Sequence, residues 1–411
     1  MQFGALRLNA PQRETKVIGL ICTGHFISHF YLLVVPPLFP VLRDIYGVGF
    51  TELGFAIAAF SIASGFTQIP VGFLVDRYGA RQLLIWGLLS ESIAISLIGV
   101  FPIYGALVTL MIAAGLSNSV FHPADYAILN ATVDNARIGR VFSFHTFTGY
   151  LGDAVAPATV LFLASLLGWR TALFVCGILG IIVAGLMWMN AELLVDATHA
   201  RHAPGKAEAH EGEPRRRGLA LILSLPVLMG LLFFATMSTA GGGIRTFGIS
   251  ALHELYGTSL GAAGLVVSVY LFVSPIGVLA GGYVADRISR HDIVAAASIL
   301  IMAGCIFSIA AFDPPLLVIG VMLGIAGFFN GFLAPPRDMM VRAMAPPSEM
   351  GKVFGFVSSG HAVAGIIGPV MYGWLLDHSD PRNVFWASGV VALFTIVTVL
   401  ATGRAGRRIG H

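Results

Sequence analysis

Residues 72–81 read GFLVDRYGAR, and residues 282–291, 210 positions further along the chain, read GYVADRISRH. In both stretches a glycine stands four residues before an Asp-Arg pair, and a long apolar run flanks each side. Two diverged copies of one short charged turn, half a chain apart, indicate a duplicated membrane protein.

The composition agrees with this interpretation. Of the 411 residues, 56% are hydrophobic and 11% charged, whereas a soluble domain has roughly 25% charged residues. A bilayer-spanning helix needs about 20 apolar residues, and the alternating pattern of β-barrel strands is missing. We therefore predict an all-α membrane protein with twelve transmembrane helices in two pseudo-symmetric six-helix bundles. The expected spans are residues 17–41, 50–73, 81–101, 103–131, 139–163, 168–190, 224–250, 258–283, 292–312, 315–344, 352–376 and 383–403.

The basic residues predict the orientation. When alternate loops are assigned to opposite faces, twenty of the 24 Lys and Arg residues fall on one face, and the other face keeps Arg43, Arg170, Arg245 and Arg382. Positive charge accumulates on the cytoplasmic face. We therefore expect a multi-pass plasma-membrane protein, in a bacterial inner membrane, with both termini cytoplasmic. The first apolar run is too long for a cleaved signal and is expected to remain as the first span.

A polar segment divides the chain. Residues 191–217 carry both signs of charge and two prolines, and they are expected to form a cytoplasmic linker between bundles at 1–190 and 218–411. The bundles align at a fixed offset: GRVFSFHTFTG begins at Gly139, and GKVFGFVSSGH begins 212 residues later at Gly351. Such matches indicate an internal duplication.

At this point the chain resembles the major facilitator superfamily over nearly its whole length. The turn after the second span is similar to the family's signature loop, which it matches at Gly72, Asp76, Arg77, Gly79 and Arg81. The second copy departs further but keeps Asp286 and Arg287. The resemblance implies two six-helix bundles around a central cavity lined by spans one, four, seven and ten.

A narrower resemblance concerns the fourth span. Residues 118–127 (NSVFHPADYA) are similar to the VFHP signature of the fosmidomycin-resistance type of drug efflux carriers. Many proton-coupled drug antiporters of the superfamily carry an arginine early in this span, but residues 108–110 here read VTL. The usual coupling residue of those antiporters is therefore missing.

The signature loop predicts a gate. A helix N-terminus carries unpaired amides and about half a positive charge, so a loop aspartate can dock on it. We expect Asp76 to face the start of helix eleven near Gly351, and Asp286 to face the start of helix five near Gly139. These contacts would link the two halves only while the inner gate is closed; the alternative is a loop that serves topology alone. Two loop glycines are expected to permit close helix approach and a tight turn, at Gly72 and Gly79.

Ionisable side chains inside spans mark transport pathways by default. On the first span, His25 and His29 are four residues apart and share a face. Either could bind an anion or carry a coupling proton, and the alternative is hydrogen bonding between helices by neutral imidazoles. Two histidines are too few ligands for zinc, so no metal is expected.

On the fourth span, Asn118, His122 and Asp125 lie on one helical face. The repeat positions of Asn118 and Asp125 are Asn330 and Arg337. We expect Asp125 and Arg337 to form an interhalf salt bridge or to bind a charged substrate. The alternative is that both simply touch water at helix ends.

Two further residues complete the candidate set. Asp153 lies mid-span, four residues before Pro157, and is the strongest candidate for proton coupling. Arg245 follows three glycines (241–243) that weaken the seventh span, and broken helices commonly form substrate sites. Its guanidinium would bind a carboxylate, phosphonate or phosphate; the alternatives are an arginine that reaches the membrane surface, or one paired with Glu254.

These features predict a secondary active transporter, proton-coupled, that moves a small anionic or zwitterionic organic solute by alternating access, with efflux slightly favoured. Uptake of an organic acid with protons is the first alternative, and a non-transporting sensor or lipid-handling protein is the second. No phosphate-binding loop, catalytic constellation or nucleotide-binding motif is present in the sequence. We expect a monomer in the bilayer, with no enzyme activity, no cofactor and no nucleic-acid partner.

Overall fold

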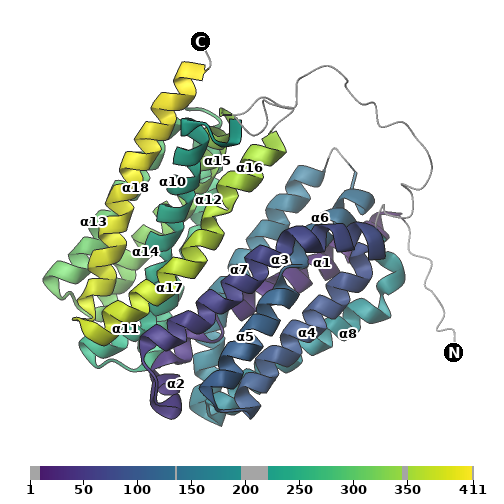
Figure 1. The fold of residues 1–411 in the computed structure, drawn as a ribbon, viewed down its shortest axis with the longest axis horizontal. Helices are drawn as coiled ribbons and strands as arrows, with labels where there is room; N and C mark the ends of the chain where they lie inside the picture. The colour runs from purple at the N-terminus through teal and green to yellow at the C-terminus, as the bar shows by residue number, and fades with distance from the viewer. Residues whose placement is uncertain (1–9, 135–136, 196–220, 345–349, 410–411) are drawn as a thin grey trace.

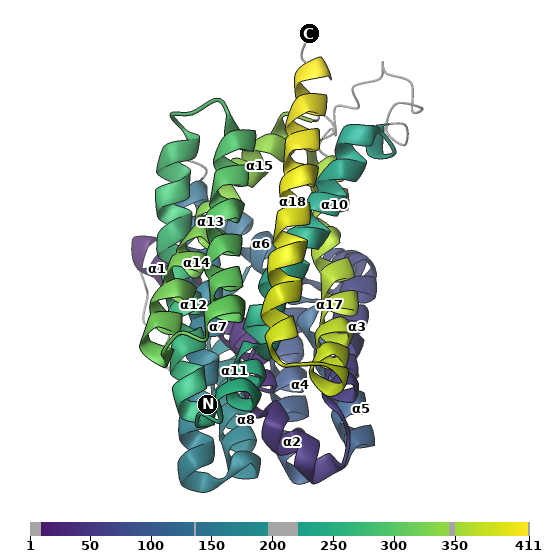
Figure 2. The ribbon, with the colours of Figure 1, turned by 90° about the vertical axis from the view of Figure 1, so that its left-hand side faces the viewer.

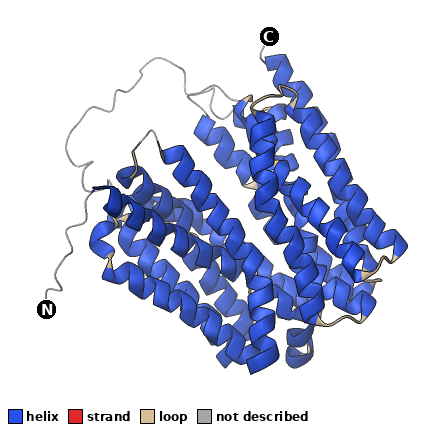
Figure 3. Cartoon of the chain, turned by 180° about the vertical axis from the view of Figure 1, so that it is seen from behind, coloured by secondary structure: helices blue, strands red, loops and turns tan. Residues whose placement is uncertain are grey.

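The computed structural model describes residues 10–134, 137–195, 221–344 and 350–409, with helices and no strand in these ranges (Figure 3). Twelve of the described segments are long and apolar enough to cross a membrane, which confirms the predicted number. Their bounds agree with the sequence expectation within a few residues at most ends. The first span is longer than expected, at Pro11–Tyr46, because a short distal helix continues it.

Seven spans run without a complete break. They are α3 (Phe50–Tyr78), α4 (Ala80–Val100), α7 (Ile138–Leu167), α8 (Trp169–Met189), α12 (Leu260–Ala285), α13 (His291–Phe312) and α18 (Arg382–Ile409). The other five consist of two helical pieces each. They are α1 (Ala10–Leu32) with α2 (Phe39–Tyr46), α5 (Tyr104–Asn118) with α6 (Phe121–Thr132), α10 (Leu225–Gly242) with α11 (Gly248–Tyr256), α14 (Leu316–Phe332) with α15 (Ala334–Arg342), and α16 (Met350–Ser358) with α17 (Gly360–His378).

Several of these interruptions coincide with prolines, which lack the N–H that continues a helix. Pro36 and Pro37 separate α1 from α2, and Pro335 stands at the start of α15. Between α10 and α11 the chain instead makes a wide π-helical turn, Gly243–Phe247. Spans one, four, seven and ten, which the family resemblance places around the cavity, all belong to the interrupted group.

The helices form two groups that lie side by side, with α1–α8 in one and α10–α18 in the other (Figures 1 and 2). The groups meet along two seams, α3 against α17 and α7 against α12. A Cβ added at Gly54 on α3 would lie 2.2 Å from the Pro369 carbonyl oxygen on α17. Glycine at this position therefore permits the close approach of the two halves.

Contacts between the halves are concentrated at the end of the molecule where α2 and α11 lie, here named the closed end. There Arg43 pairs with Glu254 at 3.1 Å, and the rings of Phe39 and Phe247 are 5.3 Å apart. Toward the other end, the open end, where α18 terminates, the two groups of helices diverge (Figures 1 and 3). The structure thus represents one state, with the halves joined at the closed end.

A carboxylate of the second half also binds the start of α3 in the first half. Asp377 accepts hydrogen bonds from the backbone N–H groups of Phe50 (2.8 Å) and Thr51 (2.7 Å), and from the Thr51 hydroxyl (2.6 Å). These are the free amides that every helix N-terminus leaves unpaired. Asp377 therefore caps a helix of the opposite half.

The chain segment at the predicted domain boundary, residues 196–220, lies outside the described residues. The division into 1–190, 191–217 and 218–411 stays a prediction.

Candidate functional site

A cavity of about 440 Å³ lies between the two halves. Spans one, four, seven and ten contribute to its wall, and spans two, five, eight and eleven complete it. Five of the residues predicted from the sequence line it: His122, Asp153, Arg245, Asn330 and Arg337. These residues come from both halves, so the structure assembles them around one space.

Asp153 occupies a central position in this cavity. Its side chain is only 4% exposed, and its Oδ2 lies 3.4 Å from His29 Nδ1 and 4.0 Å from Arg245 Nη1. Pro157, four residues later in α7, cannot donate a backbone hydrogen bond to the Asp153 carbonyl. Asp153 thus stands between an imidazole of its own half and a guanidinium of the other half.

Arg245 projects from the π-helical turn that follows the three glycines. π-Helical turns within α-helices occur frequently at functional sites. The Arg245 side chain is 46% exposed and lines the cavity. Glu254, the alternative partner, is bound to Arg43 instead, so a pairing of Arg245 with Glu254 is wrong for this state.

Arg337 is a second cation in the cavity wall and belongs to the same half as Arg245. Arg337 binds Asp338 at 2.8 Å through Nε, and its guanidinium lies 4.5 Å from the centre of the Phe234 ring. The expected salt bridge between Arg337 and Asp125 is wrong in this state, because Asp125 is buried within its own half and has other partners.

Those partners form a compact cluster behind the cavity, named here the His-Asp cluster and made of His25, Asp125 and His145. Asp125 Oδ2 lies 2.9 Å from His145 Nε2 and 3.4 Å from His25 Nδ1. The rings of His25 and His145 are stacked with centroids 3.6 Å apart. All three side chains are 3% exposed or less, so the alternative reading, in which Asp125 touches water at a helix end, is also wrong.

Asn118 lies in a different environment from the one that its helical face predicted. Asn118 donates a hydrogen bond to Glu91 at 3.0 Å, within the first half, so its side chain stabilises helix packing and is not among the cavity-lining residues. His145, which the sequence argument did not single out, binds Asp125 directly.

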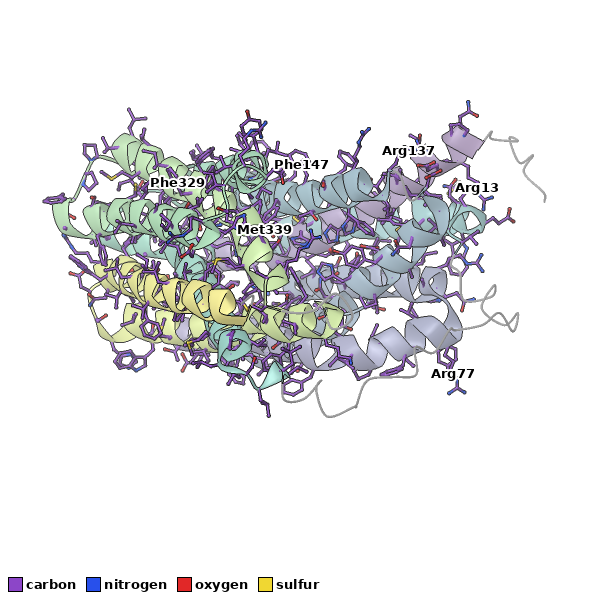
Figure 4. The ribbon with its side chains drawn as sticks, turned by 90° about the horizontal axis from the view of Figure 1, so that it is seen from above. Arg13, Arg77, Arg137, Phe147, Phe329 and Met339 are labelled. Atoms are coloured by element: carbon purple, nitrogen blue, oxygen red, sulfur yellow. The ribbon has the colours of Figure 1, made fainter. Side chains whose placement is uncertain are left out.

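In the signature loop, Gly79 joins α3 to α4 with a φ of +92°, which glycine adopts without strain. This confirms the expected turn. Close helix approach at Gly72 is wrong for this state, because a Cβ added there would meet no atom within 4 Å. Arg81 donates a hydrogen bond to the Ala191 carbonyl at 3.3 Å, and Arg77 points away from the molecule (Figure 4).

The predicted gate contacts are not formed by the residues that the structure describes. The side chain of Asp76 and the surroundings of Gly351 lie outside the described part. Asp286 is exposed, and Gly139 has open space around it, while Arg287 folds back onto the Tyr283 carbonyl at 3.0 Å. The predicted contacts would form only when the open end of the molecule closes, which this structure does not represent. They therefore stay a prediction.

Several cavity residues were missed by the sequence argument or given little weight. Tyr150 and Tyr270 line the cavity, as do Ser238 and His361, which hydrogen-bond to each other. Tyr150 lies one helical turn before Asp153, so helical spacing alone could have found it. The others come from distant spans, and the sequence carries no local signal for them.

Two repeated six-span halves, joined at one end and enclosing a charged cavity at their interface, are the architecture of a secondary membrane transporter. The model of the Major Facilitator Superfamily matches residues 21–253 and 237–408, and the chain belongs to this family.

Curated relatives span nearly the whole chain. The Fosmidomycin resistance protein of Escherichia coli K12 is 23% identical and covers 93% of this chain and 92% of its own length. This similarity confirms the resemblance inferred from residues 118–127. A probable sulfoacetate transporter of Cupriavidus necator and a D-galactonate transporter of Escherichia coli O6:H1 are each 24% identical over at least 90% of both chains.

A solved structure has the same fold. The bacterial homolog of the human lysosomal transporter Spinster, in an inward-facing and occupied conformation, matches with a TM-score of 0.77 at 13% identity. The match covers 95% of this chain and 97% of that one.

Proposed function

We propose that this transporter moves a small organic anion, or a zwitterion with an anionic group, in a proton-coupled cycle of alternating access. The observation that carries the proposal is the position of Asp153 between His29 and Arg245. One acid is thereby shared between a titratable base and the guanidinium that we assign to the substrate.

Because Asp153 contacts both groups, binding of the proton and binding of the anion affect each other. When Asp153 is ionised, it neutralises Arg245 and competes with an anionic substrate for the guanidinium. When Asp153 is protonated, Arg245 is free to bind a carboxylate, sulfonate or phosphonate with two parallel hydrogen bonds. Proton binding therefore favours anion binding, and His29 would exchange the proton with Asp153. Within the same cavity we assign His122, Asn330 and Arg337 to contacts with the substrate.

This linkage supports movement of proton and anion in the same direction. Relatives described as transporters of sulfoacetate and D-galactonate support an organic acid as the solute. Efflux, the second candidate, is supported by the VFHP sequence and by similarity to a multi-drug resistance efflux pump of Streptococcus pneumoniae. The direction of flux under an imposed pH gradient separates the two.

For orientation, we assign the open end to the cytoplasm. Arg77 and Arg137 belong to the face that carries most of the basic residues, which positive charge marks as cytoplasmic, and this face lies toward the open end. In the bilayer the structure would then face inward, and the gate contacts of Asp76 and Asp286 would form when this end closes. A bacterial inner membrane, cytoplasmic termini and a monomer complete the proposal.

The test uses purified protein in liposomes with a pH-sensitive dye inside. Sulfoacetate, D-galactonate, glucuronate and fosmidomycin form a panel of organic anions, each added to vesicles without a pH gradient. We expect at least one anion to produce proton movement that requires the protein and is lost in Arg245→Ala. Arg170→Ala removes an exposed cation of the closed end, outside the cavity wall, and should retain the signal.

Two results would overturn the proposal. Proton movement that survives Arg245→Ala would place the anion elsewhere. No movement with any anion of the panel, from protein that is folded and correctly inserted, would favour the sensor or lipid-handling alternative.

A further inference from the structure

The His-Asp cluster is built from the side chains that bind transition metals. Imidazole nitrogen and carboxylate oxygen are common ligands of zinc, and one ligand atom from each of His25, Asp125 and His145 can be chosen so that all lie within 4.8 Å of one another. We propose that this cluster binds one divalent transition-metal ion of the zinc class, separately from the anion that we assign to Arg245.

The cluster contains polar atoms with no partner. His145 Nδ1 and Asp125 Oδ1 are buried and make no hydrogen bond. A buried polar atom without a partner loses its hydrogen bonds to water and gains none in return, and a protein normally satisfies such atoms. Two such atoms in one cluster, one of them an oxygen of a fully buried carboxylate, point to a ligand that would accept their lone pairs.

Charge supports a cation as this ligand. Asp125 has no Arg or Lys partner among the contacts described, and its Oδ2 faces two imidazoles. With both imidazoles neutral, the cluster carries the single negative charge of Asp125, which a divalent cation would more than neutralise. Binding of the cation would hold both imidazoles in their neutral form.

The three ligands come from different helices of one half. His25 lies on α1, Asp125 on α6 and His145 on α7, and α1 packs closely along α7. The site would therefore move as one body with its half and would remain intact when the halves separate. This distinguishes it from Asp153, whose Arg245 contact crosses the interface.

A route and a fourth ligand are also available. The His122 ring lies 5.4 Å from the His25 ring and lines the cavity, so it stands between the cluster and the open space. Three protein ligands and a fourth position that is open to water or to His122 match the tetrahedral coordination of zinc. The argument from sequence against zinc counted two histidines on one span, whereas His145 and Asp125 come from two others.

The test is a titration of the full-length protein, purified in detergent with its affinity tag removed, with Co²⁺ as a spectroscopic probe for zinc. We expect one equivalent to bind with the intense visible absorption of tetrahedral Co²⁺, and Zn²⁺ to displace it. Asp125→Asn and His145→Gln should each remove this absorption. The matched control His253→Gln, at the closed end of the other half, should keep it.

The cluster variants also distinguish the cluster from the linker as the metal site. The linker histidines His199, His202 and His210 remain in every variant, so metal bound by them would still be seen. Absorption of equal strength in Asp125→Asn and in the unchanged protein would overturn the proposal by placing the metal elsewhere. Absence of any tetrahedral Co²⁺ from the unchanged, monodisperse protein would overturn it directly and leave the cluster as a proton-binding group. Neither result bears on the role of Arg245.

Discussion

The contact between Asp377 and the start of α3 predicts a shift in the balance of conformations. The carboxylate binds Phe50 and Thr51 from the opposite half, and these bonds can form only while the closed end is closed. Asp377→Ala removes all of them and leaves the two amides to water. The change should therefore favour states that are open at this end, because it removes stabilisation from one state and not from the other.

The magnitude follows from the energetics of helix capping. Loss of a side chain that caps a helix N-terminus costs about 0.5–2 kcal/mol. Because Asp377 is exposed, we take about 1 kcal/mol, which corresponds to a change of about fivefold in the ratio of the two states. Thr51→Ala removes one of the three bonds and should produce a smaller change in the same direction.

Distances between spin labels measure this ratio. Leu167 and Phe312 are exposed residues of opposite halves near the closed end, and both can be replaced by labelled cysteines. The native Cys22 and Cys176 are buried and are expected to react poorly with the label, and Cys305, which is half-buried, is replaced by serine. We expect Asp377→Ala to change the ratio of the long-distance to the short-distance population about fivefold, in favour of the long distance.

Asp380→Asn is the matched control. Asp380 is an acid of the loop that follows α17, three residues after Asp377, but it accepts a hydrogen bond from the Arg382 backbone within its own half. Its replacement should leave the distribution unchanged. If Asp377→Ala gave the same distribution as this control, the capping contact would carry no conformational energy and the reasoning would be refuted.

Three further predictions follow from the same structure. Gly54→Ala should also favour opening of the closed end, since its Cβ would lie 2.2 Å from the Pro369 carbonyl oxygen; a retained short distance between the labels would contradict this. Asp153→Asn should abolish proton movement but keep exchange of the anion across the membrane, and proton movement at the normal rate would exclude Asp153 as the coupling acid. Tyr31→Phe should lower the thermal midpoint, by about 1 kcal/mol of stability, because the Tyr31 hydroxyl lies 3.0 Å from Ser92 Oγ inside the first half; an unchanged midpoint in a melting curve would count against this.

The spans and their number could be predicted because they depend on local properties. A run of about 20 apolar residues crosses a bilayer wherever it stands in the chain. Gly79 was predictable for a related reason, because a turn between two long helices requires a backbone conformation that glycine adopts readily.

The pairing of residues from different spans could not be predicted in the same way. Helical spacing places Asp125 on a face, but it says nothing about which span packs against that face. The repeat offset suggested Arg337 as its partner, whereas packing of α1 and α7 supplies His25 and His145. A repeat relates positions by symmetry, and residues related by symmetry need not touch.

Asp153 was predicted from the sequence only in part. Its position inside a span marked it as a candidate, and the cavity contains it. Its two neighbours, His29 and Arg245, were each proposed separately, but only the arrangement of the helices shows that one carboxylate lies between them.

The most direct test of the account combines two pairs of spin labels, studied separately in the same lipid. One pair is Leu167 and Phe312 at the closed end, and the other is Arg140 and Ile288, exposed residues of opposite halves toward the open end. Alternating access predicts that acid pH and a bound anion change the two distances in opposite directions. Two distances that stay fixed with every anion of the panel, or that change together, would contradict a transporter whose cavity opens to each side in turn.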